Sequence, residues 1–452
     1  MQEDGCVMNG QPEQQSSSVP ARAQQEQEAA RRVRWLFAEP GVWTDRMLAA
    51  LEQGVPGGVW FRLSDKVWLS RNLESAWHKV LANRGAAGVD HMTVNAFGQN
   101  AEAYLKKLSD ELRMDHYRPQ AIRRVHIPKP GSDQMRPLGI PTVRDRVVQA
   151  ALRHVLEPIF EKDFAPHSYG FRPGRGCKDA LRRVDELLKQ GYRHVVDADL
   201  KRYFDTIPHE PLLERVRLKV ADGRALRLIE AFLKAGVMEG LDLWTPDAGA
   251  PQGAVLSPLL SNIYLDDLDH HMARLGWEMV RYADDFVVLC RSREEARRAL
   301  DEVRRWTAQA GLTLHPDKTR LVDAGEDGFD FLGYRFERGE KHPRTKSLDK
   351  LKDTIRDKTR RCQGLCLTAI IGGLNRTLRG WFEYFKHSHK WTFERLDGWI
   401  RMRLRSLLRR RQKKRGRGRG SDHQLWPNAF FAGHGLFSLQ TAHARARQSA
   451  RR

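Results

Sequence analysis

Cysteine is scarce in this sequence, and the five residues present are scattered at Cys6, Cys177, Cys290, Cys362 and Cys366. Only the last two lie close together, and no second pair completes a tetrahedral zinc site. The cysteine pattern therefore predicts reduced thiols in a cytoplasmic protein and no structural zinc.

Long apolar runs are absent as well. No segment is long enough to cross a bilayer, and the N-terminus lacks the basic-then-apolar pattern of a secretory signal, so we expect no membrane partner. The first 30 or so residues are rich in Gln, Glu and Ser and hold almost no large apolar side chains. Such a composition cannot bury enough surface to offset the entropy of ordering, and it predicts a disordered tail.

Acidic residues are too few to balance the basic ones. The 452 residues include 78 Lys and Arg against 57 Asp and Glu, which gives a formal net charge of +21. The excess is uneven, and the stretch 409–420 is especially basic and suited to contact phosphates. A polyanionic partner is the first expectation, and the length allows two or three units with their own cores.

Two adjacent carboxylates, Asp284 and Asp285, lie between two short apolar runs within the stretch 279–289. Val, Tyr and Phe on either side favour strands and Ala-Asp-Asp favours a turn, so the pattern predicts a β-hairpin with acids at its tip. Neighbouring carboxylates repel each other unless a cation lies between them, and hard oxygen ligands select Mg²⁺ or Mn²⁺. The competing interpretation is a solvated Asp-rich turn.

A two-metal site for phosphoryl transfer needs a third carboxylate from another strand. Asp199 lies near the end of the apolar run 195–200 and is the candidate. Asp197 and Asp205 lie close to it in the sequence, and we interpret both as structural. The sequence thus predicts catalytic, metal-binding roles for Asp199, Asp284 and Asp285.

Further stretches accompany these acids. Residues 168–175 read Ser-Tyr-Gly-Phe-Arg-Pro-Gly-Arg, and their Gly and Arg content suits close approach to a nucleic-acid backbone, so we expect Arg172 and Arg175 to contact the template. In the stretch 251–260, Ser257 followed by Pro258 predicts a helix start with Ser257 as the N-cap.

Two basic extended segments, 123–128 and 136–141, are joined by a turn that contains Gly131. They predict a hairpin whose cations could grip a triphosphate, although a solvated basic hairpin is the alternative. Upstream, helical spacing around 68–81 predicts a helix that ends near Asn83–Gly85.

Together these stretches, from about Trp68 to near the C-terminus, resemble the reverse transcriptases and maturases that bacterial group II introns encode, in particular class C enzymes without an endonuclease domain. The resemblance implies an α+β right-hand polymerase fold with fingers and palm on an antiparallel sheet and a helical thumb. The implied domains are a disordered tail over 1–34, an N-terminal extension over 35–118, fingers and palm over 119–340, a thumb or maturase domain over 341–411, and a short basic DNA-binding tail over 412–452.

The resemblance also implies roles for single residues. Lys129 and Arg136 would contact the incoming nucleotide, and Gln252 would lie against it. Phe204, five positions after Asp199, would lie beneath the sugar, where its ring would clash with a 2′-hydroxyl and select deoxyribonucleotides.

The same resemblance adds Leu200, the residue after Asp199, to the metal ligands. It places the Lys-Thr pair that begins at Lys318 near the primer. Two positions depart from the family pattern, His91 and Ala254, where relatives usually have Gly.

By resemblance, the chain is a bacterial, cytoplasmic, nucleic-acid-associated RNA-directed DNA polymerase that transfers nucleotides from deoxyribonucleoside triphosphates to a primer 3′-hydroxyl. Two Mg²⁺ ions would assist, with Mn²⁺ as a substitute. Its partners would be intron RNA or another RNA template and a DNA primer or target, and it would assist splicing and retrohoming.

Three other interpretations stand beside this one. A splicing maturase with an inactive polymerase site is disfavoured by the intact Asp199, Asp284 and Asp285, and an RNA-directed RNA polymerase is disfavoured by Phe204. A reverse transcriptase repurposed for DNA repair or phage defence, without an intron, is excluded by nothing in the sequence.

Overall fold

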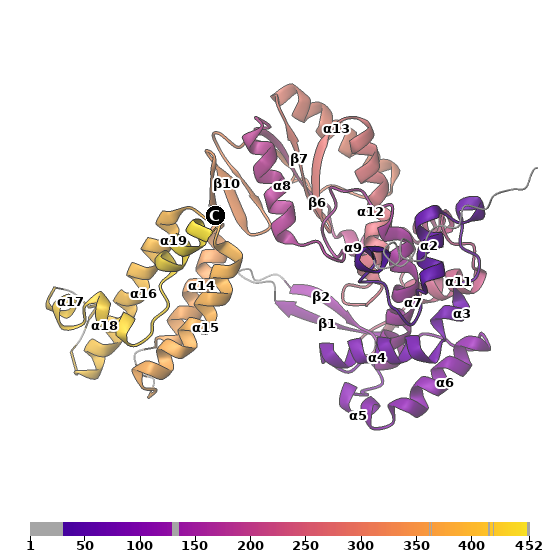
Figure 1. Ribbon diagram of the computed structural model, residues 1–452, viewed down its shortest axis with the longest axis horizontal. Helices are drawn as coiled ribbons and strands as arrows, with labels where there is room; N and C mark the ends of the chain where they lie inside the picture. Colours follow the sequence, from indigo (N-terminus) through magenta and orange to yellow (C-terminus); the bar gives the residue numbers. More distant parts are fainter. Residues whose placement is uncertain are drawn as a thin grey trace, which may run out of the picture.

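The computed structural model describes residues 30–128, 135–360, 362, 364–414, 416–418 and 420–449. Most of the predicted tail and the turn 129–134 lie outside this part of the chain. The described residues form an open right hand, with the thumb helices on the left, the palm sheet at the top and the N-terminal helices at the lower right (Figure 1). None of its helices combines the length and the apolar character needed to cross a bilayer.

The N-terminal extension is helical and packs on one long central helix. Its elements are α2 (Asp45–Gln53), η1 (Pro56–Gly58), α3 (Ser64–Val67), α4 (Ser70–Asn83), α5 (Val94–Gln99) and α6 (Ala101–Arg113). They surround α7 (Val143–Glu161), which is buried along most of its length. The helix α4 ends where the sequence predicts, but Arg84, with φ 47°, takes the left-handed C-cap position. His91 is also left-handed, with φ 55°, a conformation that Gly adopts without strain.

The palm is a four-stranded antiparallel sheet in the order β6-β7-β3-β8. Its strands are β6 (Glu278–Tyr282), β7 (Asp285–Cys290), β3 (His194–Asp199) and β8 (Arg320–Asp323). Val196, Phe286 and Val288 belong to the main core together with residues of α12 (Ser257–Arg274) and α13 (Arg293–Gln309). Val195 and Val287 point to the opposite face and pack with α8 (Cys177–Lys189). The predicted hairpin around Asp284 is confirmed.

The fingers carry a second four-stranded sheet in the order β2-β1-β4-β5. Its strands are β1 (Ile122–Pro128), β2 (Met135–Ile140), β4 (Val237–Glu239) and β5 (Asp242–Trp244). The basic hairpin β1–β2 is antiparallel as predicted, but β1 pairs with β4 in parallel. This parallel pairing is possible because β4 returns only after α9 (Tyr203–Thr206), α10 (His209–Arg217) and α11 (Gly223–Leu233).

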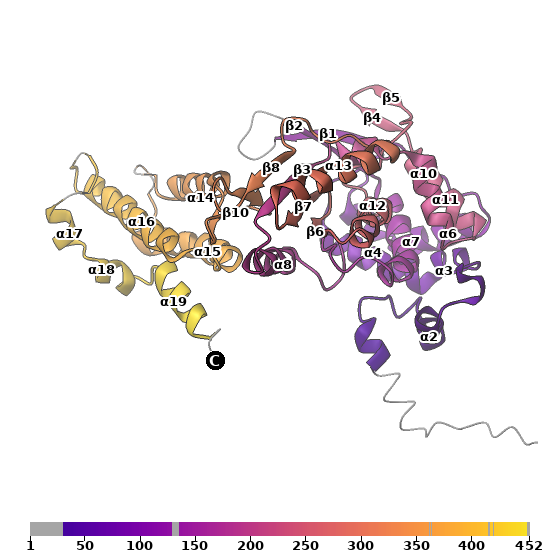
Figure 2. The ribbon, with the colours of Figure 1, turned by 90° about the horizontal axis from the view of Figure 1, so that it is seen from above.

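A three-stranded sheet links the palm to the thumb. It comprises β9 (Phe329–Phe331), β10 (Tyr334–Glu337) and β11 (Glu340–Pro343), and the chain continues into α14 (Thr345–Lys358), α15 (Leu367–Phe385) and α16 (Lys390–Arg411). The Tyr334 hydroxyl donates to the Tyr384 carbonyl at 2.6 Å, and the Tyr384 hydroxyl donates to the Leu332 carbonyl at 2.7 Å. These reciprocal bonds join the sheet to α15, and Figure 2 shows the thumb as a separate lobe beyond this joint.

The C-terminal helices belong to the thumb. They are α17 (Ser421–Leu425), α18 (Asn428–Gly433) and α19 (Leu439–Ser449). Phe431 and Leu439 are fully buried in the core that α14, α15 and α16 form, and the Asp397 carboxylate of α16 accepts the backbone N–H of Leu439 at 3.0 Å. The segment predicted as a basic tail over 412–452 thus contributes Trp426, Phe431 and Leu439 to the thumb core.

We expect Phe431→Ala to lower the free energy of unfolding of the thumb by about 3–5 kcal/mol, because it empties a fully buried aromatic site. The neighbouring Phe430 is only half-buried, so Phe430→Ala serves as the matched control and should cost clearly less. Urea denaturation followed by circular dichroism measures both. Equal, small losses would show that the C-terminal helices do not pack as described.

Candidate active site

The three predicted catalytic carboxylates meet at one end of the palm sheet. Asp199 is the last residue of β3 and pairs directly with Asp285, the first residue of β7. Residues that oppose each other on neighbouring strands share a face of the sheet. Ala283, with φ 59°, turns the chain between Tyr282 and Asp285 and leaves Asp284 at the tip.

The carboxylates are crowded and poorly solvated. Burial raises the pKa of Asp285 to about 7, with further contributions from Asp197, Asp284 and Asp199. Burial also raises the pKa of Asp284; the Asp199 carboxylate adds to this effect, and Arg136 offsets part of it. An all-oxygen cluster whose members disfavour each other's charge fits a divalent cation, which would remove that repulsion.

Lys318 is the direct cationic partner of Asp199. Its ammonium group donates to the Asp199 carboxylate, and the His315 N–H donates to the Asp199 carbonyl at 2.7 Å. Sequence analysis placed Lys318 near the primer but did not predict this ion pair. Within the described ranges, no three potential ligand side chains surround a common point.

The other nearby acids are held by arginines. The Asp197 carboxylate accepts from Arg320 at 3.0 Å, and the Asp205 carboxylate accepts from Arg202 at 3.3 Å. Both ion pairs agree with the structural role that the sequence suggested for these two residues.

Leu200 can offer a metal only its backbone carbonyl, because a leucine side chain has no donor atom; here that side chain is buried in the main core. Leu200 forms an isolated antiparallel bridge with Leu314, in which the Lys201 N–H donates to the Thr313 carbonyl. In such a pair the N–H and C=O groups of the bridged residues point away from each other. The Leu200 carbonyl thus points away from Leu314, an orientation compatible with its predicted role.

Of the predicted nucleotide contacts on the fingers, Lys129 lies outside the described residues. Arg136 is exposed on β2 opposite Ile127, and no hydrogen bond or ion pair engages it within the described residues. Its effect on the pKa of Asp284 shows that its charge acts on the catalytic end of the palm. Figure 1 shows the β1–β2 hairpin reaching from the helices toward the thumb.

Gln252 lies in a loop that is fastened to the fingers. Its carbonyl accepts the Gly139 N–H at 2.7 Å, and a Cβ on Gly253, which has φ 109°, would lie 2.5 Å from the Gly139 carbonyl oxygen. Only a glycine permits this approach. The loop that carries Gln252 is thereby held against β2.

The start of α12 differs in detail from the prediction. Ser257 is the first helical residue, and Leu256 occupies the N-cap position. The Ser257 hydroxyl donates to the Pro251 carbonyl at 2.8 Å, while Gln149 of α7 accepts from the Val255 N–H at 2.8 Å. A side chain from a distant helix thus satisfies backbone donors that a local cap would otherwise serve.

Phe204 lies on the short helix α9 immediately after the chain reverses at Arg202, which has φ 51°. Its ring is half-buried and contacts Tyr203 and Phe171 edge-on, at centroid distances of 5.5 and 6.5 Å. The Phe204 carbonyl accepts the Ala250 N–H at 2.7 Å. These contacts hold the ring in one place close to Asp199, as a steric gate requires, although the gate itself stays a prediction.

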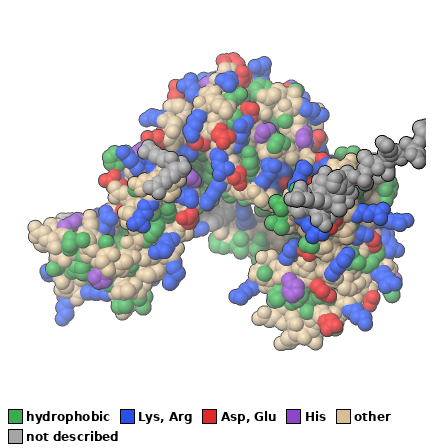
Figure 3. Space-filling view, in the orientation of Figure 1, with side chains coloured by type: hydrophobic (Ala, Val, Ile, Leu, Met, Phe, Trp, Pro, Cys, Tyr) green, Lys and Arg blue, Asp and Glu red, His purple; other side chains and the backbone are tan. Residues whose placement is uncertain are grey.

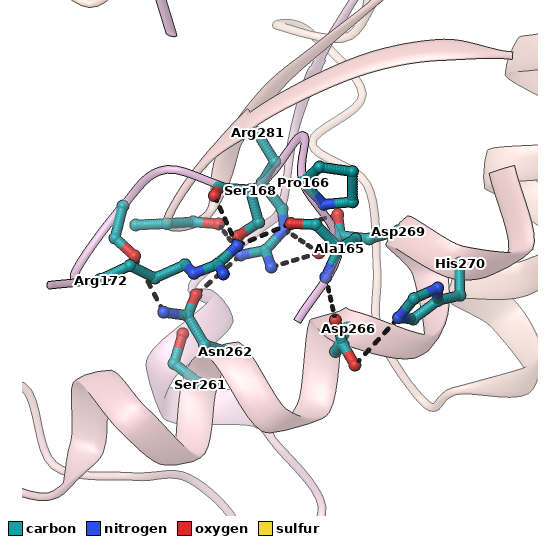
Figure 4. Close-up of polar contacts among 12 residues, drawn as sticks. Ala165, Pro166, Ser168, Arg172, Ser261, Asn262, Asp266, Asp269, His270 and Arg281 are labelled. Atoms are coloured by element: carbon teal, nitrogen blue, oxygen red, sulfur yellow. Dashed lines mark hydrogen bonds and ion pairs between the residues drawn. The ribbon is translucent and has the colours of Figure 1, made fainter. Parts of the chain in front are cut away.

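A buried arginine holds the catalytic turn. Arg281 has no exposed surface; its Nε donates to Asp269 at 2.8 Å, and its Nη1 donates to Asn262 and to the Ala283 carbonyl, both at 2.9 Å (Figure 4). Asn262 in turn donates to the Gly170 carbonyl at 2.8 Å. Sequence analysis missed this group, although a charged residue inside an otherwise apolar strand was a signal for it.

Arg172 does not contact the template, and that expectation was wrong. Its guanidinium donates to Glu161, to the Ala165 carbonyl at 2.6 Å and to the Ser168 carbonyl at 2.9 Å, and its side chain is 2% exposed. Arg172 instead fixes the segment that runs beside β6 (Figure 4). Arg175 donates to the Pro166 carbonyl at 2.6 Å but stays half-buried, so its template contact remains a prediction.

A hollow separates the thumb from the N-terminal helices. Figure 3 shows the molecule hollowed between the thumb on the left and the N-terminal helices on the right, with Lys and Arg side chains along the margins. A long polyanion fits such a space, because basic side chains neutralise phosphates on both sides.

Comparisons with known proteins agree with this geometry. Residues 127–336 match the family model described as reverse transcriptase (RNA-dependent DNA polymerase), and residues 348–426 match the group II intron maturase-specific domain. Protein YkfC of Escherichia coli (strain K12) is 33% identical over 342 residues, which cover 67% of this chain and 85% of YkfC.

Two further relatives come from introns. The group II intron-encoded protein LtrA of Lactococcus lactis subsp. cremoris is 40% identical over 208 residues, which cover 46% of this chain and 34% of LtrA. An uncharacterised 91 kDa protein in the cob intron of Schizosaccharomyces pombe is 28% identical over 370 residues, covering 63% of this chain and 46% of that protein. The chain thus spans less than half the length of these two intron proteins.

We expect Asp269→Asn to lower the free energy of unfolding by about 3–5 kcal/mol, because it leaves the Arg281 charge buried without a carboxylate. Asp301→Asn is the control, since its ion pair with Arg304 is exposed and should contribute at most about 1 kcal/mol. Urea denaturation measures both. If Asp269→Asn lowers the free energy of unfolding no more than Asp301→Asn does, the buried Arg281–Asp269 ion pair does not stabilise the turn as described.

Proposed function

Because the chain belongs to the family of group II intron reverse transcriptases and maturases, we propose that it copies an RNA template into DNA by adding deoxyribonucleotides to a primer 3′-hydroxyl. One observation carries the proposal. Asp199 and Asp285 are paired across β3 and β7, with Asp284 at the adjoining turn, at one end of the palm sheet.

Asp199, Asp284 and Asp285 would hold two divalent cations, with Mg²⁺ as the natural choice and Mn²⁺ as a substitute, and the Leu200 carbonyl would complete the ligand set. Carboxylate and carbonyl oxygens are the ligands that these hard ions prefer. When bound, the cations activate the primer hydroxyl and stabilise charge on the leaving pyrophosphate. The carboxylates contribute by fixed position and by negative charge, neither of which an Asn would supply in full.

The remaining groups bind and orient the nucleotide. Arg136 on β2 and Lys129 would neutralise the triphosphate, for which a guanidinium is suited because it can donate two parallel hydrogen bonds. Gln252 would lie against the nucleotide from a loop that is bonded to β2. Phe204 would lie beneath the sugar and exclude a 2′-hydroxyl by contact.

The maturase role follows from the second matched domain. We propose that the thumb and the C-terminal helices bind the intron RNA, assist its splicing and support its copying at a DNA target. The match to the maturase-specific domain over 348–426 supports this role, and it includes α17, whose Asp422 carboxylate accepts a hydrogen bond from Arg409 of α16. These roles in splicing and in copying the intron would place the protein in the cytoplasm, together with the RNA and DNA that it binds.

We expect Asp284→Asn to reduce primer extension on an annealed RNA template by about a thousandfold, because catalysis of this kind depends on electrostatic stabilisation by the metal site. Wild type should extend with deoxyribonucleotides and Mg²⁺, and the exposed-site variant Asp301→Asn should match it. A folded wild type that binds RNA but extends no primer would leave an RNA-binding maturase without polymerase activity.

Phe204→Ala should raise incorporation of ribonucleotides relative to deoxyribonucleotides by about tenfold to a hundredfold, because space opens for a 2′-hydroxyl. Phe204→Tyr keeps the ring and should keep the wild-type preference. Single-nucleotide extension with matched ribo- and deoxyribonucleoside triphosphates measures the ratio for each variant. An unchanged ratio in Phe204→Ala would show that Phe204 is only a packing residue.

A further inference from the structure

We propose that a groove on the thumb, separate from the polymerase site, binds an unpaired segment of RNA by stacking its bases on tryptophan. The groove lies between α14 and α16, is bounded at one end by β11, and has a volume of about 710 Å³. Its lining includes Glu340, His342, Lys352, Trp391, Arg395 and Trp399. The choice of RNA as the partner rests on the proposed function, whereas the geometry of the groove is independent of that proposal.

The groove presents aromatic faces on one side of a helix. Trp391, Arg395 and Trp399 are each four residues apart on α16, so they lie in a row with about 6 Å between neighbours along the helix axis. Trp391 is 53% exposed, whereas Phe393 on the opposite side of the helix is fully buried in the thumb core. A half-exposed tryptophan inside a concave surface offers a π-face on which any base can stack.

Basic side chains lie among these rings. Arg395, between the two tryptophans, is exposed and makes no hydrogen bond or ion pair with the described residues. Lys352 forms a long ion pair with Asp349 at 3.9 Å, and Arg356, which is paired with Asp353, lies over the Trp399 ring with 5.8 Å from its Cζ to the ring centroid. Rings with an exposed cation between them suit a strand whose bases and phosphates alternate.

The β11 end of the groove favours RNA over DNA. The Glu340 carboxylate lies 3.1 Å from the His342 Nε2 and 3.4 Å from the His389 Nε2. A carboxylate repels a phosphate but accepts a hydrogen bond from a 2′-hydroxyl, and the imidazoles supply donors and acceptors beside it. A helical protein segment is the competing occupant, and Arg395, which lies between the tryptophans without a partner among the described residues, is a poor match for its apolar face.

The test uses the full chain and a short oligouridine that carries 5-iodouridine, with a saturating unlabelled primer–template duplex to occupy the polymerase site. Irradiation should crosslink the RNA to the peptide that contains Trp391. Trp391→Ala should weaken binding about tenfold or more, and Trp391→Phe should retain most of it. Arg395→Ala should make the slope of log affinity against log salt shallower by about 0.7, the value for one phosphate contact in a single strand.

Phe61→Ala is the matched control, because Phe61 is 64% exposed on the N-terminal extension and far from the groove in the chain. It should leave binding unchanged. Unchanged affinity of Trp391→Ala, crosslinks confined to other peptides, or equal competition by duplex RNA or by the DNA strand of the same sequence would each overturn the proposal. Primer extension is measured separately, so loss of polymerase activity with intact crosslinking would contradict the proposed function alone.

Discussion

The catalytic turn depends on one buried ion pair. Arg281 and Asp269 are both almost completely removed from solvent, and each would be strongly destabilising there without the other. The same guanidinium donates to the Ala283 carbonyl, so the charge pair also fixes a backbone turn whose left-handed residue leads directly to Asp284. This pair, which costs much free energy to break, therefore defines where the carboxylates proposed to bind metal lie.

Support for that turn continues outward through close backbone contacts. A Cβ on Gly170 would lie 2.2 Å from the Ala283 nitrogen, so the segment that carries Gly170 can rest against the turn only as glycine. Asn262 holds the Gly170 carbonyl, and Arg172 holds the carbonyls of Ala165 and Ser168. Two arginines in this region, Arg281 and Arg172, thus stabilise the backbone from inside the protein, although the sequence led us to expect a template contact for Arg172.

This rigid support matters because the negatively charged carboxylates of Asp199, Asp284 and Asp285 repel each other. Burial and neighbouring charge raise the pKa of Asp285 to about 7, and Lys318 compensates Asp199 directly. The fold keeps these groups together against their repulsion, which prepares the site for cations with a higher charge than an ammonium group. In the thumb, by contrast, several aromatic residues are buried in a core shared with the C-terminal helices, whereas Trp391 remains exposed beside Arg395.

The sequence alone determined the elements whose signals are local. Alternating apolar residues and an Ala-Asp-Asp turn were enough to predict the hairpin β6–β7, and helical spacing was enough to predict where α4 ends. Motif resemblance correctly indicated the right-hand fold and the reverse transcriptase and maturase family. Tertiary structure alone decided the partners of charged side chains: the direct opposition of Asp199 and Asp285, the ion pair of Lys318, the burial of Arg281 and the internal role of Arg172. Whether a charge meets solvent, nucleic acid or a buried counter-ion depends on segments far away in the chain, and no local pattern carries that information.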